Sequence, residues 1–283
     1  MAKKRIVFQG ELGANSDLAA RKAYPDYEPV PAHTFEDCFT ALSSGEVDFG
    51  MIPIENSIAG RVADIHHLLP EAGLHIVGEY FMPVHHQLLA PKGASLGSLK
   101  TVESHVHALG QCRKIIRRLR LTAVVSADTA GSAREVAEAG DITRASIATS
   151  LAAKIYGLKT LERDIEDEAH NTTRFVVLSR NKAWAKPDTK RVVTSFVFQV
   201  RNIPAALYKA LGGFATNGVN MTKLESYMIG GSFSATQFYA DVEGHPQHRG
   251  LQLALNELEF FCRKGTLRIL GVYPAHSFRK TLG

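Results

Sequence analysis

Short apolar segments alternate with amphipathic segments over the first two thirds of the chain. Ile6-Val7-Phe8 is the first apolar segment, and Gly10 and Gly13 follow it before a helix expected to open near Ser16. This alternation predicts an α/β fold with a largely parallel sheet. Further strands are expected at residues 47–54, 74–77, 87–90, 122–125, 145–148 and 175–178, and helices at residues 34–42, 107–119, 131–139 and 149–156.

The pattern changes after residue 178. Residues 179–190 are polar, contain Pro187 and lack apolar periodicity, which predicts a linker. The order of elements beyond it is βαββαβ, the order of a ferredoxin-like unit, with a hairpin expected around Gly230-Gly231. The strands of this unit are expected at residues 192–200, 223–228, 233–242 and 266–273, and its helices at residues 205–217 and 249–262.

Composition places the chain among packed globular proteins. It has 283 residues, of which 45% are hydrophobic and 22% are charged. The longest apolar runs are too short to cross a bilayer, and Gly10 and Glu11 interrupt the start before a signal-peptide apolar region could form. We therefore expect neither secretion nor a membrane partner. The three cysteines lie far apart without a CxxC pair, which favours a reducing cytoplasm.

Charge and histidine content exclude two further classes of function. The formal charge of +5 suits an anionic small molecule and is too weak to indicate a nucleic-acid partner. The basic run Arg113–Arg120 contains no aromatic residue for base stacking, so we interpret it as a solvated helix face. Twelve histidines invite a metal site, but their adjacent pairs lack the spacing of zinc ligands, so no metal is expected.

Two loops that follow predicted strands carry candidate chemistry. In residues 9–16, glycines and a helix start would favour an anion, but by themselves they are better explained by an ordinary tight turn capped by Ser16. In residues 53–60, Glu55, Asn56 and Ser57 follow a buried strand, where ligand sites of α/β folds collect. The alternative is that Asn56 or Ser57 only caps a helix starting near residue 61.

A third polar segment, Asn171-Thr172-Thr173-Arg174, precedes the buried strand at residues 175–178. Its hydroxyls and guanidinium can donate hydrogen bonds to a carboxylate. Arg174 could instead pair with Asp164, Glu166 or Asp167. By itself the segment favours a structural role.

Several segments together resemble the prephenate dehydratase family. They occur in order and almost from end to end of the chain. The matching segments are Phe8-Gln9-Gly10 with Gly13-Ala14 and Ser16, Pro53-Ile54-Glu55-Asn56-Ser57, Ser104-His105 with Ala108-Leu109-Gly110-Gln111-Cys112, Asp128-Thr129-Ala130-Gly131-Ser132-Ala133, and Thr173-Arg174-Phe175. The C-terminal part resembles the ACT regulatory domain of the same enzymes through residues 206–211 and 220–226.

The resemblance implies a domain organisation. A catalytic domain at residues 1–180 would have two lobes like a type-2 periplasmic binding protein, one formed by about 1–80 plus 165–180 and the other by about 81–164. A linker at 181–190 and an ACT domain at 191–283 would follow. The chain starts on the first strand with no chorismate mutase segment before it, so a monofunctional, cytoplasmic enzyme is expected. ACT association through sheets implies a homodimer or homotetramer.

The implied reaction converts prephenate to phenylpyruvate, carbon dioxide and water in phenylalanine biosynthesis. Aromatisation drives the elimination, so no cofactor is needed, and a group near the ring hydroxyl can act as general acid. The family's essential threonine corresponds to Thr173, which we expect to donate a hydrogen bond to the departing oxygen. Arg174 and Glu55 are the other catalytic candidates. The expected substrate-binding residues are Gly13, Ser16, Asn56, Ser57, Ser104, Gln111 and Phe175.

The regulatory segment departs from the family pattern at two places. The glycine-alanine-leucine motif reads Ala205-Ala206-Leu207, and glutamate-serine-arginine-proline reads Glu225-Ser226-Tyr227-Met228. Phenylalanine is nevertheless the expected effector, with altered sensitivity or selectivity. The residues expected to bind it are Ala206, Leu207, Asn220, Met221, Glu225 and Ser226.

Three other interpretations compete with this one. Arogenate dehydratase performs the same elimination on the transaminated substrate, and the motifs do not separate the two. A noncatalytic amino-acid sensor would have no need of Thr173-Arg174-Phe175. A nucleic-acid binder built on Arg113–Arg120 predicts steeply salt-dependent association.

Overall fold

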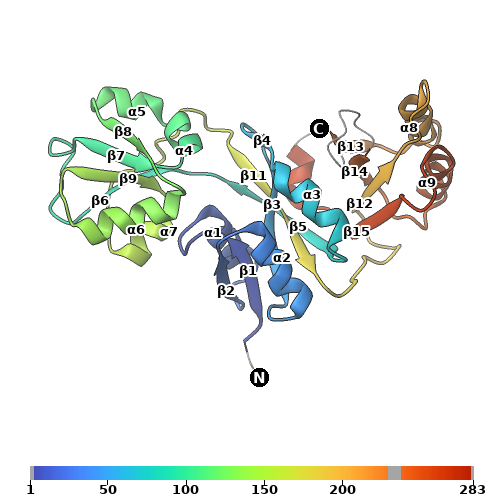
Figure 1. The fold of residues 1–283 in the computed structure, drawn as a ribbon, viewed down its shortest axis with the longest axis horizontal. Coiled ribbons are helices and arrows are strands. Elements are labelled where there is room, and N and C mark those ends of the chain that lie inside the picture. Colours follow the sequence, from blue (N-terminus) through green and yellow to red (C-terminus); the bar gives the residue numbers. More distant parts are fainter. Residues whose placement is uncertain (1–2, 229–236, 282–283) are drawn as a thin grey trace. The chain divides into compact units, whose positions relative to one another are not determined.

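The computed structural model describes residues 3–228 and 237–281. The chain divides into two compact units, one of residues 1–62 and 80–175 and the other of residues 63–79 and 176–283. Residues 63–79 thus belong with the C-terminal part, although they follow the first strands in sequence. The fold is mixed α/β with two sheets, and Figure 1 labels its elements.

The first lobe of the first unit is a mixed sheet flanked by helices. Its strand order is β11-β3-β1-β2, and β1 pairs in parallel with both β2 and β3. Thr34 and Asp37 form the expected capping box at the start of α2. The elements of this lobe are β1 (Arg5–Gln9), α1 (Asn15–Ala23), β2 (Glu28–Ala32), α2 (Phe35–Ser44), β3 (Phe49–Asn56), β4 (Gly60–Arg61) and β11 (Thr172–Ser179).

The second lobe is a five-stranded sheet with helices on both faces. Leu88 and Leu89 are adjacent on β6 and point to opposite faces, because side chains alternate along a strand. Leu88 packs in the core with α4 and α5, and Leu89 packs with α6 and α7 (Figure 1). The strand order is β10-β6-β9-β7-β8. The elements are β6 (Gln87–Ala90), β7 (Thr101–Ser104), α4 (Val106–Gln111), α5 (Arg113–Arg118), β8 (Thr122–Val125), α6 (Thr129–Ala139), β9 (Arg144–Ala148), α7 (Ser150–Tyr156) and β10 (Lys159–Glu162).

The single helix predicted at residues 107–119 is wrong. The helix breaks at Cys112, whose backbone is not helical, and restarts as α5. The Asp167 carboxylate accepts the backbone N–H groups of Arg113 at 2.9 Å and Lys114 at 3.1 Å. These bonds satisfy donors that a helix start leaves open, so a distant residue stabilises the break.

Four strands were not predicted: β2, β4, β7 and β10. β2 contains Pro29 and Pro31, and it lies at the sheet edge, where a missing N–H is tolerated. β10 also lies at an edge and is interrupted by a bulge between Thr160 and Glu162. Neither strand carries the regular alternation that a sequence pattern detects.

The second unit contains the predicted βαββαβ order. Its strands follow the order β13-β14-β12-β15-β5, and the β14–β12 and β12–β15 pairs are antiparallel. Helices α8 and α9 pack against one face of this sheet through a core that includes Phe196, Phe214 and Leu255. The elements are α3 (Ala63–Glu71), β5 (His75–Pro83), β12 (Val192–Gln199), α8 (Ala206–Thr216), β13 (Met221–Tyr227), β14 (Gln237–Glu243), α9 (Arg249–Phe261), β15 (Arg268–Pro274) and the 3₁₀ helix η1 (Ser277–Thr281).

Three further sequence expectations concern the linker, the turn at Gly230-Gly231 and membrane spans. Residues 180–191, between β11 and β12, contain no helix or strand, as a linker would. The expected turn at Gly230-Gly231 and residues 233–236 lie outside the described residues. Among the residues that the structure describes, no helix is both long enough and apolar enough to cross a membrane.

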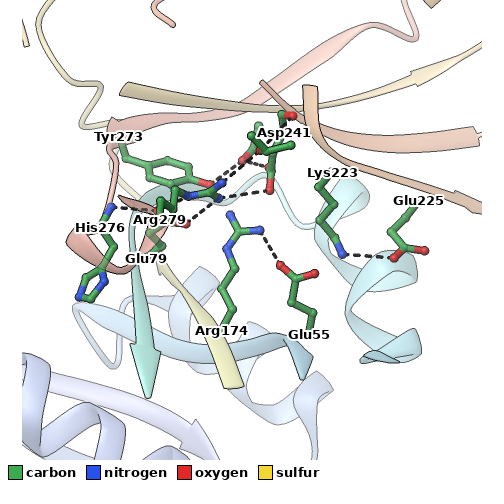
Figure 2. A network of polar contacts seen from close by, with 11 residues as sticks. Glu55, Glu79, Arg174, Lys223, Glu225, Asp241, Tyr273, His276 and Arg279 are labelled. Atoms are coloured by element: carbon green, nitrogen blue, oxygen red, sulfur yellow. Dashed lines mark hydrogen bonds and ion pairs between the residues drawn. The ribbon is translucent and has the colours of Figure 1, made fainter. Parts of the chain in front are cut away.

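A buried polar network holds the C-terminal 3₁₀ helix to the second unit (Figure 2). Arg279 forms two hydrogen bonds with the Glu79 carboxylate, at 2.7 and 2.9 Å. The Glu79 side chain is fully buried, and that of Arg279 is 8% exposed. Asp241 lies 3.7 Å from the same guanidinium and accepts the Ser195 hydroxyl, which also bonds Tyr273. The charges are therefore paired inside the unit.

Candidate active site

The end of β3 and the start of β11 bring Asn56 and Thr173 together. The Asn56 amide donates to the Thr173 hydroxyl oxygen at 3.0 Å and to the Asn171 side-chain oxygen at 2.7 Å. Its own oxygen accepts the backbone N–H groups of Ile58 at 3.0 Å and Ala59 at 2.8 Å. These four bonds fix the orientation of the Asn56 amide, so the Thr173 oxygen acts as an acceptor toward it.

A second set of bonds connects Asn171 with the second lobe. The Gln111 side-chain oxygen accepts from the Asn171 amide at 2.7 Å and bonds Nε2 of His86 at 3.0 Å. Because a carboxamide oxygen only accepts, His86 carries its proton on Nε2. Its buried Nδ1 has no hydrogen-bond partner among the described residues. Burial lowers the pKa of His86, which leaves a neutral imidazole at neutral pH.

These side chains line a cavity of about 170 Å³, which we call the Thr173 cavity. Two helices begin at its wall, because Asn15 is the first residue of α1 and Thr129 is the first residue of α6. Helix N-termini favour anions. The lining residues are Asn15, Asn56, Ala59, Val84, His86, His105, His107, Ala108, Gln111, Thr129, Asn171 and Thr173.

His105 and His107 contribute two further imidazoles to the cavity. Their ring centroids are 5.1 Å apart, and Nδ1 of His105 accepts the backbone N–H of His107 at 3.4 Å. Burial lowers the pKa of His105, the neighbouring His107 lowers it further, and Asp128 opposes both. The His105 imidazole is therefore neutral at neutral pH, and an anion bound beside it would favour its protonated form.

Arg174 and Glu55 point away from the Thr173 cavity. Glu55 is next to Asn56 on β3, and Arg174 is next to Thr173 on β11. Successive side chains of a strand face opposite sides, so these two point away from the side that Asn56 and Thr173 occupy. The Arg174 guanidinium pairs with the Glu55 carboxylate at 2.9 Å, rather than with Asp164, Glu166 or Asp167 as one interpretation allowed (Figure 2). The Arg174 side chain is 3% exposed and that of Glu55 is 32% exposed, so the guanidinium is shielded from solvent and the carboxylate is partly open to it.

The other predicted substrate-binding residues lie near the cavity without lining it. Ser57 donates to the His170 carbonyl at 2.8 Å, and buried Ser104 donates to the Ile147 carbonyl at 2.6 Å. Ser16 is buried in α1, and Phe175 is a core residue. Of the seven, the structure brings Asn56 and Gln111 to the cavity wall with Thr173.

Gly13 has a packing role between the lobes. Its φ is +92°, and an added Cβ would lie 2.8 Å from the Ala152 Cα of α7. The Gly13 carbonyl accepts the Thr149 hydroxyl at 2.5 Å. Nearby, Arg134 of α6 holds the Glu11 carboxylate at 2.8 and 3.1 Å. The glycine loop of the first lobe is therefore packed against the second lobe.

The predicted regulatory residues lie on α8, on β13 and, for Asn220, directly before β13 in the second unit. Ala206 is buried at the start of α8, and Leu207 packs beside its core. Asn220 donates to Glu243 at 3.2 Å, and Lys223 pairs with Glu225 at 3.2 Å. Met221 and Ser226 lie on β13. The structure thus places these residues in two adjacent segments of one unit.

Sequence reasoning missed the histidines and the helix starts. His86 and His107 were weighed only as metal ligands, and His105 also stood in a segment that resembles the family without being chosen as a site residue. Asn171, Asn15 and Thr129 were not chosen as site residues either. Asn171 directly precedes Thr172-Thr173, and Thr129 lies in a segment that carries the family resemblance. Their position at strand and helix ends was the signal that could have identified them.

One trio of side chains has the chemistry of a metal site. His85, Asp164 and Glu166 bring one ligand atom each within 4.8 Å of one another. Nδ1 of His85 already bonds Glu166 at 2.7 Å, and Asp164 accepts the Gln87 amide at 3.0 Å. These groups therefore satisfy one another without an ion.

Comparison with known proteins places the chain in a family. The family model for prephenate dehydratase matches residues 6–183. A bifunctional N-acyl-homoserine lactone acylase/prephenate dehydratase of Komagataeibacter europaeus is 51% identical over 275 residues, covering 97% of this chain and 97% of that protein. The chain belongs to the prephenate dehydratase family, whose members are lyases that dehydrate and decarboxylate their substrate.

Two further relatives bear on substrate and regulation. Arogenate dehydratase/prephenate dehydratase 2 of Arabidopsis thaliana, a chloroplastic protein, is 39% identical, with 96% of this chain and 73% of that protein covered. The crystal structure of prephenate dehydratase from Arthrobacter aurescens in complex with L-Phe has a similar fold, with a TM-score of 0.87. The sequences of the two chains are 28% identical. That comparison covers 96% of this chain and 90% of the other.

Proposed function

We propose that this protein converts prephenate to phenylpyruvate, carbon dioxide and water in the Thr173 cavity. The observation that carries the proposal is the Asn56–Thr173 hydrogen bond. Since the Thr173 oxygen accepts from Asn56, its hydroxyl hydrogen is left to donate elsewhere. A substrate in the cavity then receives this donor.

The reaction needs one good hydrogen-bond donor at the leaving oxygen. The electrons of the C–CO₂ bond enter the ring, the C–O bond to the ring hydroxyl breaks, and hydroxide takes up a proton to leave as water. Thr173 donates to that oxygen as negative charge develops on it. Preorganised donors of this kind are worth about 10²–10³-fold in rate.

The rest of the cavity suits a dianion. Prephenate carries two carboxylates, and the described lining residues include no lysine or arginine. The N-termini of α1 and α6 supply partial positive charge, and the His105 imidazole can hydrogen-bond a carboxylate, which favours its protonated form.

The Glu55–Arg174 pair acts in this proposal as a positioning pair rather than as a catalytic one. Glu55 precedes Asn56 on β3, and Arg174 follows Thr173 on β11. Their 2.9 Å contact joins the two strands next to the Asn56–Thr173 bond. Holding the two strands in register holds the donor in place.

The test is phenylpyruvate formation near neutral pH by the wild type and by Thr173→Val, which removes the hydroxyl and keeps the shape. Thr173→Ser is the control, because it keeps the hydroxyl. We expect about a 10²-fold loss of kcat in the valine variant and less than tenfold in the serine variant. Equal rates in folded wild type and valine variant would contradict the role of Thr173.

The same assay with arogenate determines substrate preference, and no turnover of either substrate would contradict the dehydratase activity itself.

A second candidate activity is hydrolysis of an N-acyl-homoserine lactone amide. It rests on the name of the Komagataeibacter relative at 51% identity and on the neutral imidazole of His105, a competent base for activating water. Release of homoserine lactone by the wild type but not by His105→Ala would support it. No release by the wild type would remove this activity and leave the dehydratase proposal unaffected.

We further propose feedback control by phenylalanine through an ACT domain at residues 191–283. The named L-Phe complex of the Arthrobacter protein and the βαββαβ order support it. β13 is an edge strand of its sheet, which suits association of two such domains into a homodimer or homotetramer. Thermal-shift titration with phenylalanine tests the effector, with tyrosine and tryptophan as controls, and light scattering tests the oligomer. No response to any of the three would contradict control by an aromatic amino acid.

A further inference from the structure

A second cavity of about 520 Å³ lies in the first unit and shares no lining residue with the Thr173 cavity. We call it the Lys154 cavity. The segment 83–87 lies between the two: Val84 and His86 line the Thr173 cavity, whereas Pro83, His85 and Gln87 line the Lys154 cavity. The volume falls in the usual range of small-molecule sites, about 300–1,000 Å³.

Three cationic side chains line this cavity, and no anionic side chain pairs with them among the described residues. Lys22 comes from α1, Lys154 from α7 and Arg163 from the segment after β10. None of the three forms an ion pair or a side-chain hydrogen bond with another described residue. Asp164 is the only carboxylate among the described lining residues, and it already accepts the Gln87 amide at 3.0 Å. The wall therefore keeps an excess of positive charge.

The remaining wall of the Lys154 cavity is partly apolar. Leu18 of α1, Pro83, Ala153 and Leu158 line it, and Ala153 and Leu158 belong to the core of the second lobe. A ligand that satisfies both parts of the wall needs negative charge at one end and a nonpolar body at the other. Simple salts lack the second part, and fatty acids carry a single charge.

We propose that the Lys154 cavity binds a small organic anion with at least two negative charges and a nonpolar part. Such a ligand contacts Lys22 of the first lobe and Lys154 and Arg163 of the second, so it bridges the lobes. Its site is also close to the catalytic elements, since α1 carries Asn15 at the Thr173 cavity and Lys22 at this one. Binding should therefore stabilise the unit against unfolding.

The test is calorimetric titration of the full chain with phenyl phosphate and with phenylsuccinate, which separate a phosphate from a dicarboxylate ligand. The binding variant is Lys22→Gln/Lys154→Gln/Arg163→Gln. The matched control is Lys92→Gln/Lys100→Gln/Arg117→Gln, which removes the same charge at exposed positions of the same unit. Both triple variants change only exposed side chains, and Lys154→Gln alone serves as a milder form.

We expect saturable binding by the wild type below about 1 mM for at least one probe. The binding variant should bind at least about tenfold more weakly, and the control variant within about twofold of the wild type. A melting temperature raised by the same probe in the wild type and not in the binding variant would agree. Equal weakening in both triple variants, or no binding by the wild type, would overturn the proposal. These readouts do not depend on turnover, so they stand apart from the test of the dehydratase activity.

Discussion

The side-chain amide of Asn56 donates a hydrogen bond to the hydroxyl oxygen of Thr173, 3.0 Å away. The two residues are 117 positions apart in the chain and meet where β3 ends and β11 begins. The direction of this bond determines where the Thr173 hydrogen can point. The proposed chemistry depends on that direction.

Reversing the Asn56–Thr173 bond should remove activity. In Asn56→Asp the carboxylate only accepts, so Thr173 donates to it and no longer to the substrate. We expect kcat to fall by about 10²-fold, with the fold preserved in circular dichroism. Asn56→Ser, which keeps a donor, is the control and should be less affected. A kcat for Asn56→Asp within twofold of the wild type would show that the bond direction is irrelevant.

Replacing Gly13 should destabilise the protein mainly because a Cβ would collide with the second lobe, and less because of its positive φ. In Gly13→Ala the new Cβ meets Ala152 at 2.8 Å, at a φ of +92°. Gly93→Ala is a close control, because its φ is +94° and nothing lies within 4 Å of the new Cβ. We expect the Gly13 variant to lose about 1–3 kcal/mol more free energy of unfolding than the control in urea denaturation. Equal losses would mean that the contact with Ala152 relaxes without cost.

The Glu79–Arg279 pair should stabilise the second unit far more than a surface ion pair does (Figure 2). Arg279→Met removes the two hydrogen bonds that Arg279 donates to the buried Glu79 carboxylate, although the backbone N–H of His276 still donates to it at 3.0 Å. Losing the charge partner of a buried carboxylate costs about 3–5 kcal/mol. Arg268→Met is the control: its 3.5 Å pair with Glu71 is exposed at both side chains and is worth about 0–1 kcal/mol. Thermal and urea unfolding of both variants measure the difference. Similar small losses would indicate that water replaces Arg279 at Glu79.

Stability should fall as the pH drops, partly through His86. Burial lowers its pKa in the folded state, whereas the unfolded chain titrates near about 6.5. The contribution of the neutral imidazole is therefore complete above that value and is lost as the pH falls through the folded-state pKa. We expect the free energy of unfolding to decline less between pH 7 and pH 5 in His86→Gln than in the wild type. His170→Gln, at a side chain that is 72% exposed, should keep the wild-type decline.

Ala205 should be a site where glycine stabilises the protein. It caps α8 in the left-handed region, with a φ of +61°, where a Cβ costs about 1–2 kcal/mol. The related family motif has glycine at this position. Part of the gain is offset by the greater freedom of glycine in the unfolded chain, so Ala205→Gly should raise the free energy of unfolding by about 0.5–1 kcal/mol. A lower melting temperature for Ala205→Gly than for the wild type would contradict this assignment of strain.

The alternation of apolar and polar residues was enough to predict most strands and helices and the βαββαβ order of the second part. Local signals were also read correctly where they act over a few residues, as at the Thr34–Asp37 capping box. Such features depend on neighbours in sequence, so the sequence by itself determined them. The segments that resemble the family likewise led to Thr173, Asn56 and Gln111.

Tertiary structure decided the features that depend on distant residues. The helix predicted at 107–119 is broken because Asp167, more than 50 residues away, accepts the N–H groups of Arg113 and Lys114. The prolines of β2 are tolerated only because that strand lies at an edge. Thr173 faces the cavity and Arg174 faces Glu55 because adjacent side chains of a strand point to opposite sides. A motif lists both residues side by side, and only the pairing of β11 with its neighbours determines which of them faces the cavity.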